Sequence, residues 1–363
     1  MKIAFLGDIA LIGKYDITKN SDVKQRLKPL STKLEEYDYV IGNLESPLTD
    51  EKNTLICKSM HLKTSTLNVE LLKYLHIDAV SLANNHVYDY GLKGFLDTIN
   101  TLENNGIDWF GANLKDLTKE INGEKITFSG FCCYSTNGSG YIEENNRKGV
   151  NLLTYDNVMR QVRKDKESES FSIMSFHWGD EHTNYPKYEH KKFAEKIANN
   201  NDVIIYGHHP HVIQGIQKLN NSLVAYSLGN FLFDDCTSIT GGLVLKQNSQ
   251  NKKSFILDIE IKNRSIIDQK YHGFREDENG FVFYDIENEI DEISKPLNKI
   301  ESIDKYEETR KMQINKVREE KFGERDINWL ISRMNYYSIG AFLTAKLRRK
   351  KYMKEAVKFL GGN

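Results

Sequence analysis

Short apolar runs alternate with amphipathic segments through the first two hundred residues of the chain. The runs cover residues 3–6, 39–41, 79–83, 171–176 and 203–206. Such continuous runs are typical of parallel strands that are buried on both faces. The segments 68–76, 92–105, 155–166 and 188–200 have helical patterns, and Gly106 suits the position just after the second helix. This alternation predicts βαβ units and an α/β fold.

The pattern changes after Tyr226, where strand-like segments follow one another without helices between them. They cover residues 241–245, 254–261, 266–271 and 280–284. We expect these segments to complete a second sheet. The predicted architecture is therefore a sandwich of two β-sheets flanked by helices, followed by a helical tail.

From about Ile286 the chain is polar, densely charged and helical in pattern. We predict one domain over residues 1–285 and a charged helical extension over residues 286–363. Residues 346–358 hold seven Lys or Arg and one Glu, a net charge of +6 (7 − 1). Two interpretations stay open for this segment. Its basic face could bind an anionic polymer or an anionic membrane, or its apolar side could pack on the main domain. The apolar side consists of Phe342, Leu343, Leu347 and Phe359.

Each of the five apolar runs ends in polar groups that could bind a metal ion. Asp8 follows the first run, Asn43 and Glu45 the second, Asn84, Asn85 and His86 the third, His177 the fourth, and His208, His209 and His211 the fifth. Ligands of open α/β sheets bind outside the carboxyl ends of the strands, so we expect one shared site. A single Asp or His at a strand end is usually a turn former or a helix cap. Carboxylates, amides and imidazoles together instead predict a centre for Zn, Mn or Fe.

The order of these motifs is itself informative. They are Gly-Asp at 7–8, Asn-Leu-Glu-Ser-Pro at 43–47, Ser-Leu-Ala-Asn-Asn-His-x-x-Asp-Tyr-Gly at 81–91, His-Trp-Gly-x-Glu at 177–181, Gly-His-His-Pro-His-Val at 207–212 and Tyr-Ser-Leu-Gly-Asn-Phe-x-Phe-Asp at 226–234. In this order they resemble the CapA family, the poly-γ-glutamate capsule synthesis proteins. That family is related to the calcineurin-like metallophosphoesterases, whose two-sheet sandwich the resemblance also implies. The resemblance runs from about residue 1 to about residue 245.

The resemblance implies roles for individual residues. The expected metal ligands are Asp8, Glu45, Asn85, His177, His209 and His211. His86 is expected to stabilise or protonate the leaving oxygen, and Asp89 either orients His86 or caps the loop. We assign five further residues to substrate binding, with His208 outside the set of metal ligands. The five are Asn43, Asn84, Glu181, His208 and Asn230.

The resemblance implies one or two divalent ions, Mn, Fe or Zn, that activate water and hold phosphoryl oxygens. One departure concerns the first motif, which is Asp-x-His in the wider superfamily. Ala10 stands at the position of that histidine. Three outcomes stay open for the first metal: weak binding, a replacement ligand such as Glu181 or His182, or no metal at all.

We therefore predict a metal-dependent hydrolase, first of all a phosphoesterase, in the synthesis of a capsule or cell-surface polymer. Its expected partner is an anionic polymer or a phosphorylated glycan or lipid-linked substrate. Two alternatives stay open. One is a non-catalytic assembly or export factor for an anionic polymer, and the other is an enzyme of amide-bond chemistry on poly-γ-glutamate. Fold and metal ligands alone do not identify the substrate.

Composition adds an expectation about location. The net charge of −1 gives no global signal for nucleic acid or membrane, and we expect no nucleic-acid partner. The four cysteines include no C-x-x-C pair, which favours reduced thiols in a cytoplasmic protein. Residues 1–6 are too short for the apolar part of a signal peptide. We expect a cytoplasmic protein whose basic C-terminal helix could touch the membrane from outside it.

Overall fold

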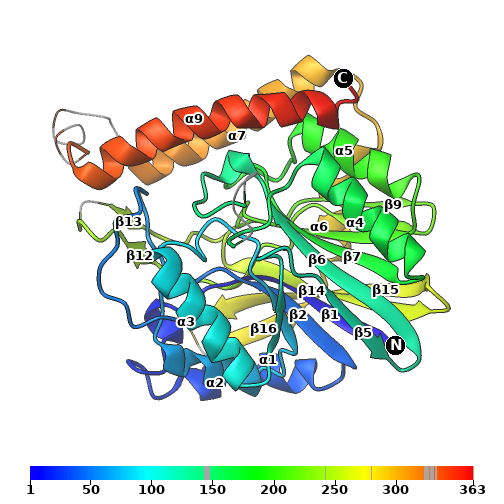
Figure 1. Cartoon of the computed structure of the whole chain (residues 1–363), viewed down its shortest axis with the longest axis horizontal. Coiled ribbons are helices and arrows are strands. Elements are labelled where there is room, and N and C mark those ends of the chain that lie inside the picture. The colour runs from blue at the N-terminus through cyan, green and yellow to red at the C-terminus, as the bar shows by residue number, and fades with distance from the viewer. Residues whose placement is uncertain are drawn as a thin grey trace.

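The computed structural model describes residues 1–142, 148–241, 243–278, 280–322, 327, 331 and 333–362. Two large β-sheets pack face to face, and helices cover their outer faces (Figure 1). Side chains of both sheets meet between them: the rings of Phe5 and Tyr206 have centroids 5.0 Å apart, and those of Tyr39 and Phe128 lie 5.3 Å apart. The predicted α/β sandwich of two sheets flanked by helices is confirmed.

The first sheet combines parallel strands from the start of the chain with antiparallel strands from its later part. Its order is β16 (Gly280–Tyr284), β15 (Ser265–Asp277), β14 (Lys253–Lys262), β1 (Lys2–Ile9), β2 (Tyr39–Leu44), β3 (Ala79–Ser81) and β4 (Asp108–Phe110), and β11 (Asn230–Leu232) pairs in parallel with β1. β14 pairs antiparallel with β1, with Lys2 opposite Glu260. The prediction that these later strands complete a second sheet is therefore wrong, because they extend the sheet of β1 instead.

The second sheet is built around the strands that carry the later motifs. Its order is β5 (Leu117–Ile121), β6 (Glu124–Cys132), β7 (Phe171–His177), β8 (Val203–His208), β10 (Ser222–Ala225) and β9 (Ile216–Leu219). β6, β7, β8 and β10 are parallel. The five predicted parallel strands are thus divided between two sheets. Only Val244–Leu245 of the predicted strand 241–245 forms a strand, β13, which pairs with β12 (Cys236–Thr237); residue 242 lies outside the described part of the chain.

The four predicted helices of the main body are confirmed to within two residues at each end. α2 (Val69–Tyr74), α3 (Gly91–Asn104), α4 (Tyr155–Glu167) and α5 (Tyr188–Ala198) correspond to them, and α1 (Val23–Leu34) and the short 3₁₀ turns η1 (Gly13–Tyr15), η2 (Thr66–Asn68) and η3 (Tyr134–Thr136) complete the set. α1 packs on β16 and α3 on β4, whereas α4 and α5 pack on the second sheet. Alternate residues of β1 serve two cores: Ile3 and Phe5 face the other sheet, and Ala4 and Leu6 join the helix side.

Three helices follow the last strand: α6 (Glu287–Asn298), α7 (Ile303–Phe322) and α9 (Tyr336–Phe359). α6 buries Ile290 among residues between the sheets. α9 runs across one end of the molecule near α5 (Figure 1), and Phe359 stacks on Phe193 of α5 with centroids 4.3 Å apart. The sequence also predicts that the amphipathic basic segment begins at Trp329 and ends at Leu360, and Trp329 lies outside the described part of the chain.

The alternative that α9 packs its apolar side on the main domain holds for only part of that side. Phe359 is buried, but Phe342, Leu343 and Leu347 are 70%, 55% and 62% exposed.

Within the described ranges, no helix has both the length and the apolar character to cross a bilayer. All four cysteines have free thiols.

A buried imidazole joins α9 to the second sheet. His190 stacks on Trp178, with centroids 5.0 Å apart, and its Nε2 lies 3.1 Å from the hydroxyl of Tyr352. Burial lowers the pKa of His190 from 6.5 to about 3. The folded protein keeps this ring neutral, whereas the unfolded chain binds a proton below a pH of about 6.5. Stability is therefore lost as the pH falls from about 6.5 toward 3.

Replacing His190 tests this linkage. We expect His190→Gln to lower the free energy of unfolding near neutral pH by about 1 to 3 kcal/mol, because it disturbs a buried contact. The deficit should shrink by about 1 kcal/mol per pH unit below about pH 6, since glutamine has no proton to gain. Denaturant unfolding across the pH range measures this, with the exposed His76 replaced by Gln as the control. A deficit that is constant across the range would contradict the account.

Candidate metal centre

Strands of both sheets end at one edge of the sandwich, and the candidate ligands lie at or just after these ends. Asp8 lies in β1, Glu45 follows β2, Asn85 and His86 follow β3, His177 ends β7, and His209 and His211 follow β8. All seven of these side chains are buried. The end of β8 approaches the backbone after β10 so closely that a Cβ on Gly207 would lie 1.9 Å from the carbonyl oxygen of Tyr226. The structure thus brings together all six predicted metal ligands and His86.

Glu45 lies at the centre of this group. Its Oε1 is 3.7 Å from Nε2 of His177, 3.8 Å from Nε2 of His211 and 4.0 Å from Nε2 of His86. None of these contacts is a hydrogen bond, and both carboxylate oxygens are buried without a hydrogen-bond partner. Burial and the nearby Asp8 raise the pKa of Glu45 well above its usual value. The ionised form of such a buried carboxylate costs free energy unless a cation neutralises it.

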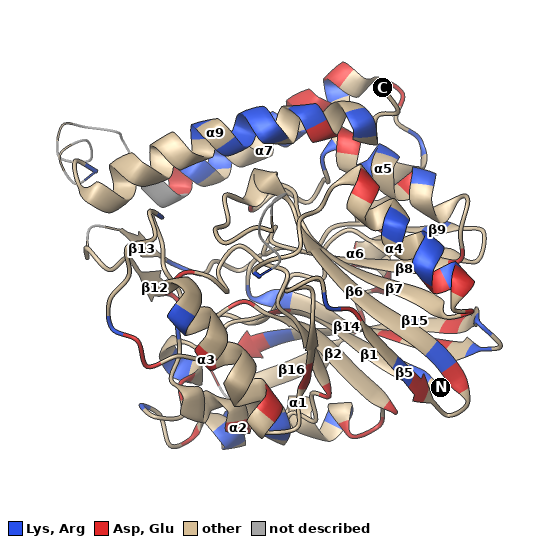
Figure 2. Ribbon diagram, viewed as in Figure 1, with Lys and Arg blue, Asp and Glu red and all other residues tan. Residues whose placement is uncertain are grey.

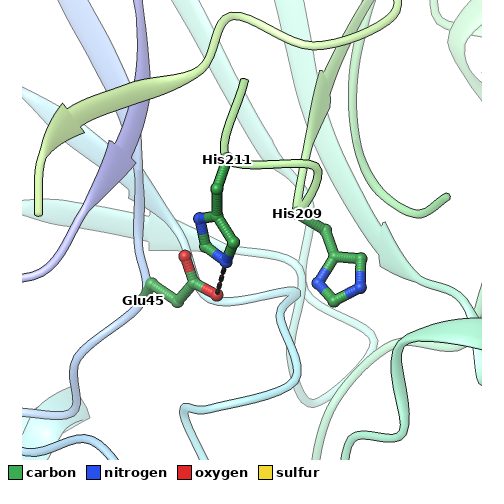
Figure 3. Close-up of side chains that lie close together, drawn as sticks. All are labelled: Glu45, His209 and His211. Carbon is green, nitrogen blue, oxygen red and sulfur yellow. Dashed lines mark ion pairs between the residues drawn. The ribbon is translucent and has the colours of Figure 1, made fainter. Parts of the chain in front are cut away.

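Glu45, His209 and His211 form the group with metal-binding geometry, since one ligand atom of each lies within 4.8 Å of the others (Figure 3). His209 and His211 adopt left-handed backbone conformations, with φ of 93° and 56°. Such conformations are uncommon for residues other than glycine and cluster at functional sites. Here they turn two imidazoles, two residues apart, toward the same carboxylate.

The histidines differ in their electrostatic environment. Burial and neighbouring histidines lower the pKa of His177. Burial also lowers the pKa of His209, to about 4, despite the attraction of Glu181. Burial opposes protonation of His211 too, but Glu45 and Asp8 outweigh it and raise the pKa of His211 to about 10. A cation at this site would take the place of that proton in balancing the two carboxylates.

Asp8 is enclosed by hydrogen-bonding groups. Asn43 donates from Nδ2 to its Oδ1 at 2.8 Å, and the backbone N–H of His209 donates to its Oδ2 at 3.2 Å. Nδ1 of His208 lies 3.0 Å from Oδ1, and Nδ1 of His211 lies 3.3 Å from Oδ2. Burial opposes ionisation, but these histidines outweigh it and hold the pKa of Asp8 well below its usual value.

The other two predicted ligands contact each other. His177 donates from Nε2 to Oδ1 of Asn85 at 2.9 Å, and Asn85 donates from Nδ2 to the carbonyl of Thr136 at 3.0 Å. Ring centroids of His177 and His209 are 4.9 Å apart. His177 and Asn85 therefore adjoin the triad of Glu45, His209 and His211.

Three residues predicted to bind substrate, Asn43, Asn84 and His208, are buried beside the ligands. Asn84 binds Asn43 and the carbonyl of Leu44 through Nδ2, and its Oδ1 accepts from the backbone of His86. Asn43 holds Asp8, and His208 lies beside Asp8 at 1% exposure. These side chains are buried and surround the site, and their role in substrate binding stays a prediction.

The other two predicted substrate-binding residues are Asn230, which contacts His211, and Glu181, which is partly exposed. Asn230 accepts from Nδ1 of His211 at 2.9 Å and so positions that ring. Glu181 is about half exposed, at 49%, and pairs with His182 at 3.4 Å. It lines the cavity described below, and its role in substrate binding stays a prediction. Neither Glu181 nor His182 belongs to the triad within the part of the chain that the structure describes.

Ala10 stands where the superfamily has an imidazole, and it is buried in a small apolar cluster with Ile12, Met60 and Leu62. Its backbone N–H donates to the carbonyl of Leu232 at 2.7 Å. The position of the missing histidine is thus filled by hydrocarbon.

His86 belongs to a buried network that includes one residue not predicted from the sequence. Its Nδ1 lies 2.6 Å from Oδ2 of Asp89, which also accepts from the backbone of Leu62 at 2.8 Å. Lys58 is also buried, with Nζ 2.8 Å from Oδ1 of Asp89 and 3.0 Å from Nδ1 of His86. Burial and Lys58 lower the pKa of His86 more than Asp89 raises it. No motif or periodicity marks Lys58, which lies in an irregular loop.

A cavity of about 350 Å³ adjoins the centre. Asn85, His86 and His209 line it from the metal side, together with Lys58. Residues of α7 line it from the C-terminal extension: Ile314, Val317 and Arg318. The extension, which the sequence associates with location, therefore also borders the candidate site.

α7 is tied to the loop after β7 by polar contacts. Arg310 is buried, and its NH2 group lies 2.7 Å from Oδ2 of Asp180 while its Nε donates to the carbonyl of Tyr185 at 3.0 Å. Gln313 accepts from the hydroxyl of Thr183 at 3.0 Å. These contacts place the cavity-lining side of α7 beside Glu181.

The part of the chain that carries the candidate ligands is similar to known proteins. Residues 2–235 match the model of a family described as bacterial capsule synthesis protein PGA_cap. The chain belongs to this family. The resemblance drawn from the motif order is therefore confirmed. The candidate ligands all fall within the matched residues, whereas α7 and α9 lie beyond them.

Three curated proteins are similar to this chain. The PGA biosynthesis protein CapA of Bacillus subtilis (strain 168) is 32% identical over 244 residues, which cover 64% of this chain and 63% of that protein. The capsule biosynthesis protein CapA of Bacillus anthracis is 30% identical over 275 residues, covering 71% and 66%. A probable polyglutamine synthesis accessory protein of Mycobacterium tuberculosis is 26% identical over 219 residues, covering 56% and 57%. The match spans less than two thirds of each relative's own length.

The Glu45 carboxylate provides a test of metal binding. We expect Glu45→Gln to unfold at a temperature no lower than the metal-free wild type, because the variant removes a buried carboxylate whose oxygens have no hydrogen-bond partner. Mn²⁺ or Zn²⁺ at about one hundred times its Kd should stabilise the wild type by about 2.7 kcal/mol and the variant far less. Thermal denaturation with and without metal, together with the metal content of the purified protein, measures both effects.

Glu181→Gln is the matched control, because it removes a carboxylate near the cavity but outside the triad. We expect this control to keep the stabilisation by metal. Equal stabilisation of Glu45→Gln and the wild type would remove Glu45 from the set of ligands.

Proposed function

We propose that this protein is a metal-dependent phosphoester hydrolase that acts in the synthesis of an anionic capsule or cell-surface polymer. The observation that best supports metal dependence is the buried Glu45 carboxylate, whose oxygens have no hydrogen-bond partner. His209 and His211 lie within 4.8 Å of it and would hold the ion with it. This mixture of one carboxylate and two imidazoles suits Zn, Mn or Fe. Asp8, Asn85 and His177 adjoin the triad and would serve a second ion.

A bound divalent ion would supply Lewis-acid chemistry, by lowering the pKa of water and polarising a phosphoryl oxygen. The residues of the chain do the rest. Phosphoester hydrolysis forms a bond from a water oxygen to phosphorus and breaks the bond to the leaving oxygen, which must gain a proton. The enclosed strand ends exclude bulk water from this step and fix the ligands in place.

His86 is the group placed to serve the leaving oxygen. It lines the cavity, its Nδ1 is held by Asp89 at 2.6 Å, and its Nε2 lies on the side of Glu45 at 4.0 Å. With Nδ1 donating to Asp89, the ring gives up a proton from Nε2 only in its imidazolium form, which the Asp89 carboxylate favours and which burial and Lys58 oppose. Lys58 donates from Nζ to Oδ1 of Asp89, the carboxylate oxygen that His86 does not contact, and so holds Asp89 in place.

The cavity walls favour an anionic substrate. Lys58, which is paired with Asp89, and Arg318 both line the cavity, and no ion pair within the described part of the chain engages Arg318. The acidic Asp180 on the same wall is already paired with Arg310 and with Lys187 at 2.9 Å. Arginine binds phosphate oxygens in a planar fork. A phosphorylated glycan or a lipid-linked phosphate intermediate has the chemistry that this wall would bind.

The capsule context rests on the family and on the printed names of the relatives, two of which are biosynthesis proteins for a capsule or for PGA. A screen against phosphomonoesters, phosphodiesters and γ-glutamyl peptides, with Mn²⁺, Zn²⁺ or Fe²⁺ added, tests the reaction. We expect turnover of a phosphoester that Glu45→Gln abolishes. Turnover of γ-glutamyl peptides alone would show amide chemistry, and no turnover with metal bound would favour an assembly factor.

The role of His86 predicts a dependence on the leaving group. We expect His86→Ala to retain its metal but to lose roughly 10²- to 10⁴-fold in kcat on alkyl phosphates, which need a proton on the leaving oxygen. Activated aryl phosphates should lose far less, because their leaving groups need little protonation. His61→Ala removes a nearby buried imidazole that does not line the cavity and serves as the control. Equal losses on both substrate classes would exclude His86 from proton transfer.

The position of Arg318 predicts a contribution to substrate binding. We expect Arg318→Ala to raise KM for an anionic substrate roughly five- to tenfold with little change in kcat, because an arginine contact with phosphate is lost. Lys316→Ala, on the same helix but away from the cavity, should leave KM unchanged. Steady-state kinetics of both variants measure the difference. A KM that both substitutions leave unchanged would show that α7 does not touch the substrate.

A further inference from the structure

The outer face of α9, with Leu360 just after it, carries a row of exposed apolar side chains. They are Ile339, Phe342, Leu343, Leu347, Met353, Val357 and Leu360, and each is between 48% and 70% exposed. Soluble proteins rarely leave so many large apolar groups uncovered on one helix, and contiguous patches of this kind mark sites of association. The opposite face of α9 buries Ala341, Tyr352, Ala356 and Phe359 against the body of the protein.

Basic side chains are interleaved with this row. Ile339, Leu343, Lys346, Lys350, Met353 and Val357 follow one another at steps of four and three residues, which places them along one side of the helix. Arg349 and Lys354 flank them and are also exposed. Figure 2 shows this concentration of Lys and Arg along α9. Within the described residues, no carboxylate pairs with Lys346, Arg349, Lys350 or Lys354.

The charged groups of α9 that face the protein differ from those that face outward. Glu355 is the only acidic residue of the helix, and it is turned inward, where it accepts from the backbone N–H of Tyr155 at 3.4 Å. Arg348 is also turned inward and donates from NH1 to Oδ1 of Asn137 at 2.7 Å. The outward face therefore combines apolar side chains with charged side chains that are all cationic.

We propose that the outer face of α9 docks on an anionic membrane surface, with its apolar side chains in the interface and its cations on lipid phosphates. Helices that lie in the plane of a membrane combine apolar side chains with Lys and Arg in this way. α9 has 24 residues and so extends about 36 Å along the surface. Because this face lies outside the cavity-lining residues, the proposal does not depend on the proposed reaction.

Two other occupants fit the same face less well. A second copy of the chain would bring the same cations against each other, which opposes a symmetric contact. A soluble anionic polymer would satisfy the cations but would leave the seven apolar side chains in water or against polar groups. The membrane interface satisfies both kinds of side chain.

Co-sedimentation of the full-length protein with lipid vesicles tests the proposal. We expect binding to phosphatidylcholine vesicles that contain about a third of phosphatidylglycerol, weak binding to phosphatidylcholine alone, and loss of binding as salt screens the cations. Phe342→Ser with Leu343→Ser should weaken binding to the anionic vesicles at least about tenfold. Lys346→Glu with Lys350→Glu should weaken it about tenfold or more, because each cation contributes about fivefold.

Matched double variants elsewhere provide the controls. Leu67→Ser with Leu92→Ser removes two exposed apolar side chains from the main body, and Lys24→Glu with Lys28→Glu reverses two exposed charges with the same spacing on α1. We expect both controls to bind like the wild type, and all four variants to unfold at the wild-type temperature.

Three results would overturn the proposal. One is a failure of the wild type to bind anionic vesicles. Another is binding that the two α9 variants and the two controls weaken equally. The third is a different occupant of this face. The wild type would then sediment as a dimer or bind soluble polyglutamate tightly, and Phe342→Ser with Leu343→Ser would abolish that association but leave vesicle binding unaffected.

Discussion

Removing the Glu45 carboxylate from water without giving it a hydrogen-bond partner is the constraint around which the rest of this site is arranged. An isolated buried charge costs several kcal/mol even after relaxation, so the fold must place compensating groups nearby. It does so with imidazoles from β7 and from the turn after β8, and with His86 from the loop after β3. In the metal-free chain, protonated His211 carries the compensating charge. A divalent ion would carry it more effectively.

The two-sheet architecture makes this arrangement available. β1, β2 and β3 approach the site from one sheet and β7 and β8 from the other, so that ligands from distant parts of the sequence share one edge. Close backbone approach is essential near the end of β8, where there is no room for a side chain on Gly207. The left-handed conformations of His209 and His211 lie in the turn just after β8. The C-terminal extension then covers the cavity with α7 and presents α9 outward.

Much of the site could be predicted from sequence because strand ends and short motifs are local signals. Helix and strand positions in the main body follow from periodicity, as α4 and β16 show. The pairing of β14 with β1 could not be predicted, because an apolar segment fits either sheet and only long-range packing selects its partner. Lys58 and Arg318 were missed for a similar reason: each reaches the site by tertiary packing alone. Composition identified α9 as basic, but the division between buried Phe359 and exposed Phe342 depends on which face meets α5.

The central claim is that Glu45, His209 and His211 hold a divalent ion. An anomalous difference map from crystals grown with Mn²⁺ tests it most directly, because the map locates the ion independently of activity. The account predicts a peak bonded to one Glu45 oxygen and to one ring nitrogen of each histidine, at about 2.0 to 2.2 Å. A map without a peak at this triad, or with the only ordered Mn²⁺ at Glu181 and His182, would contradict it.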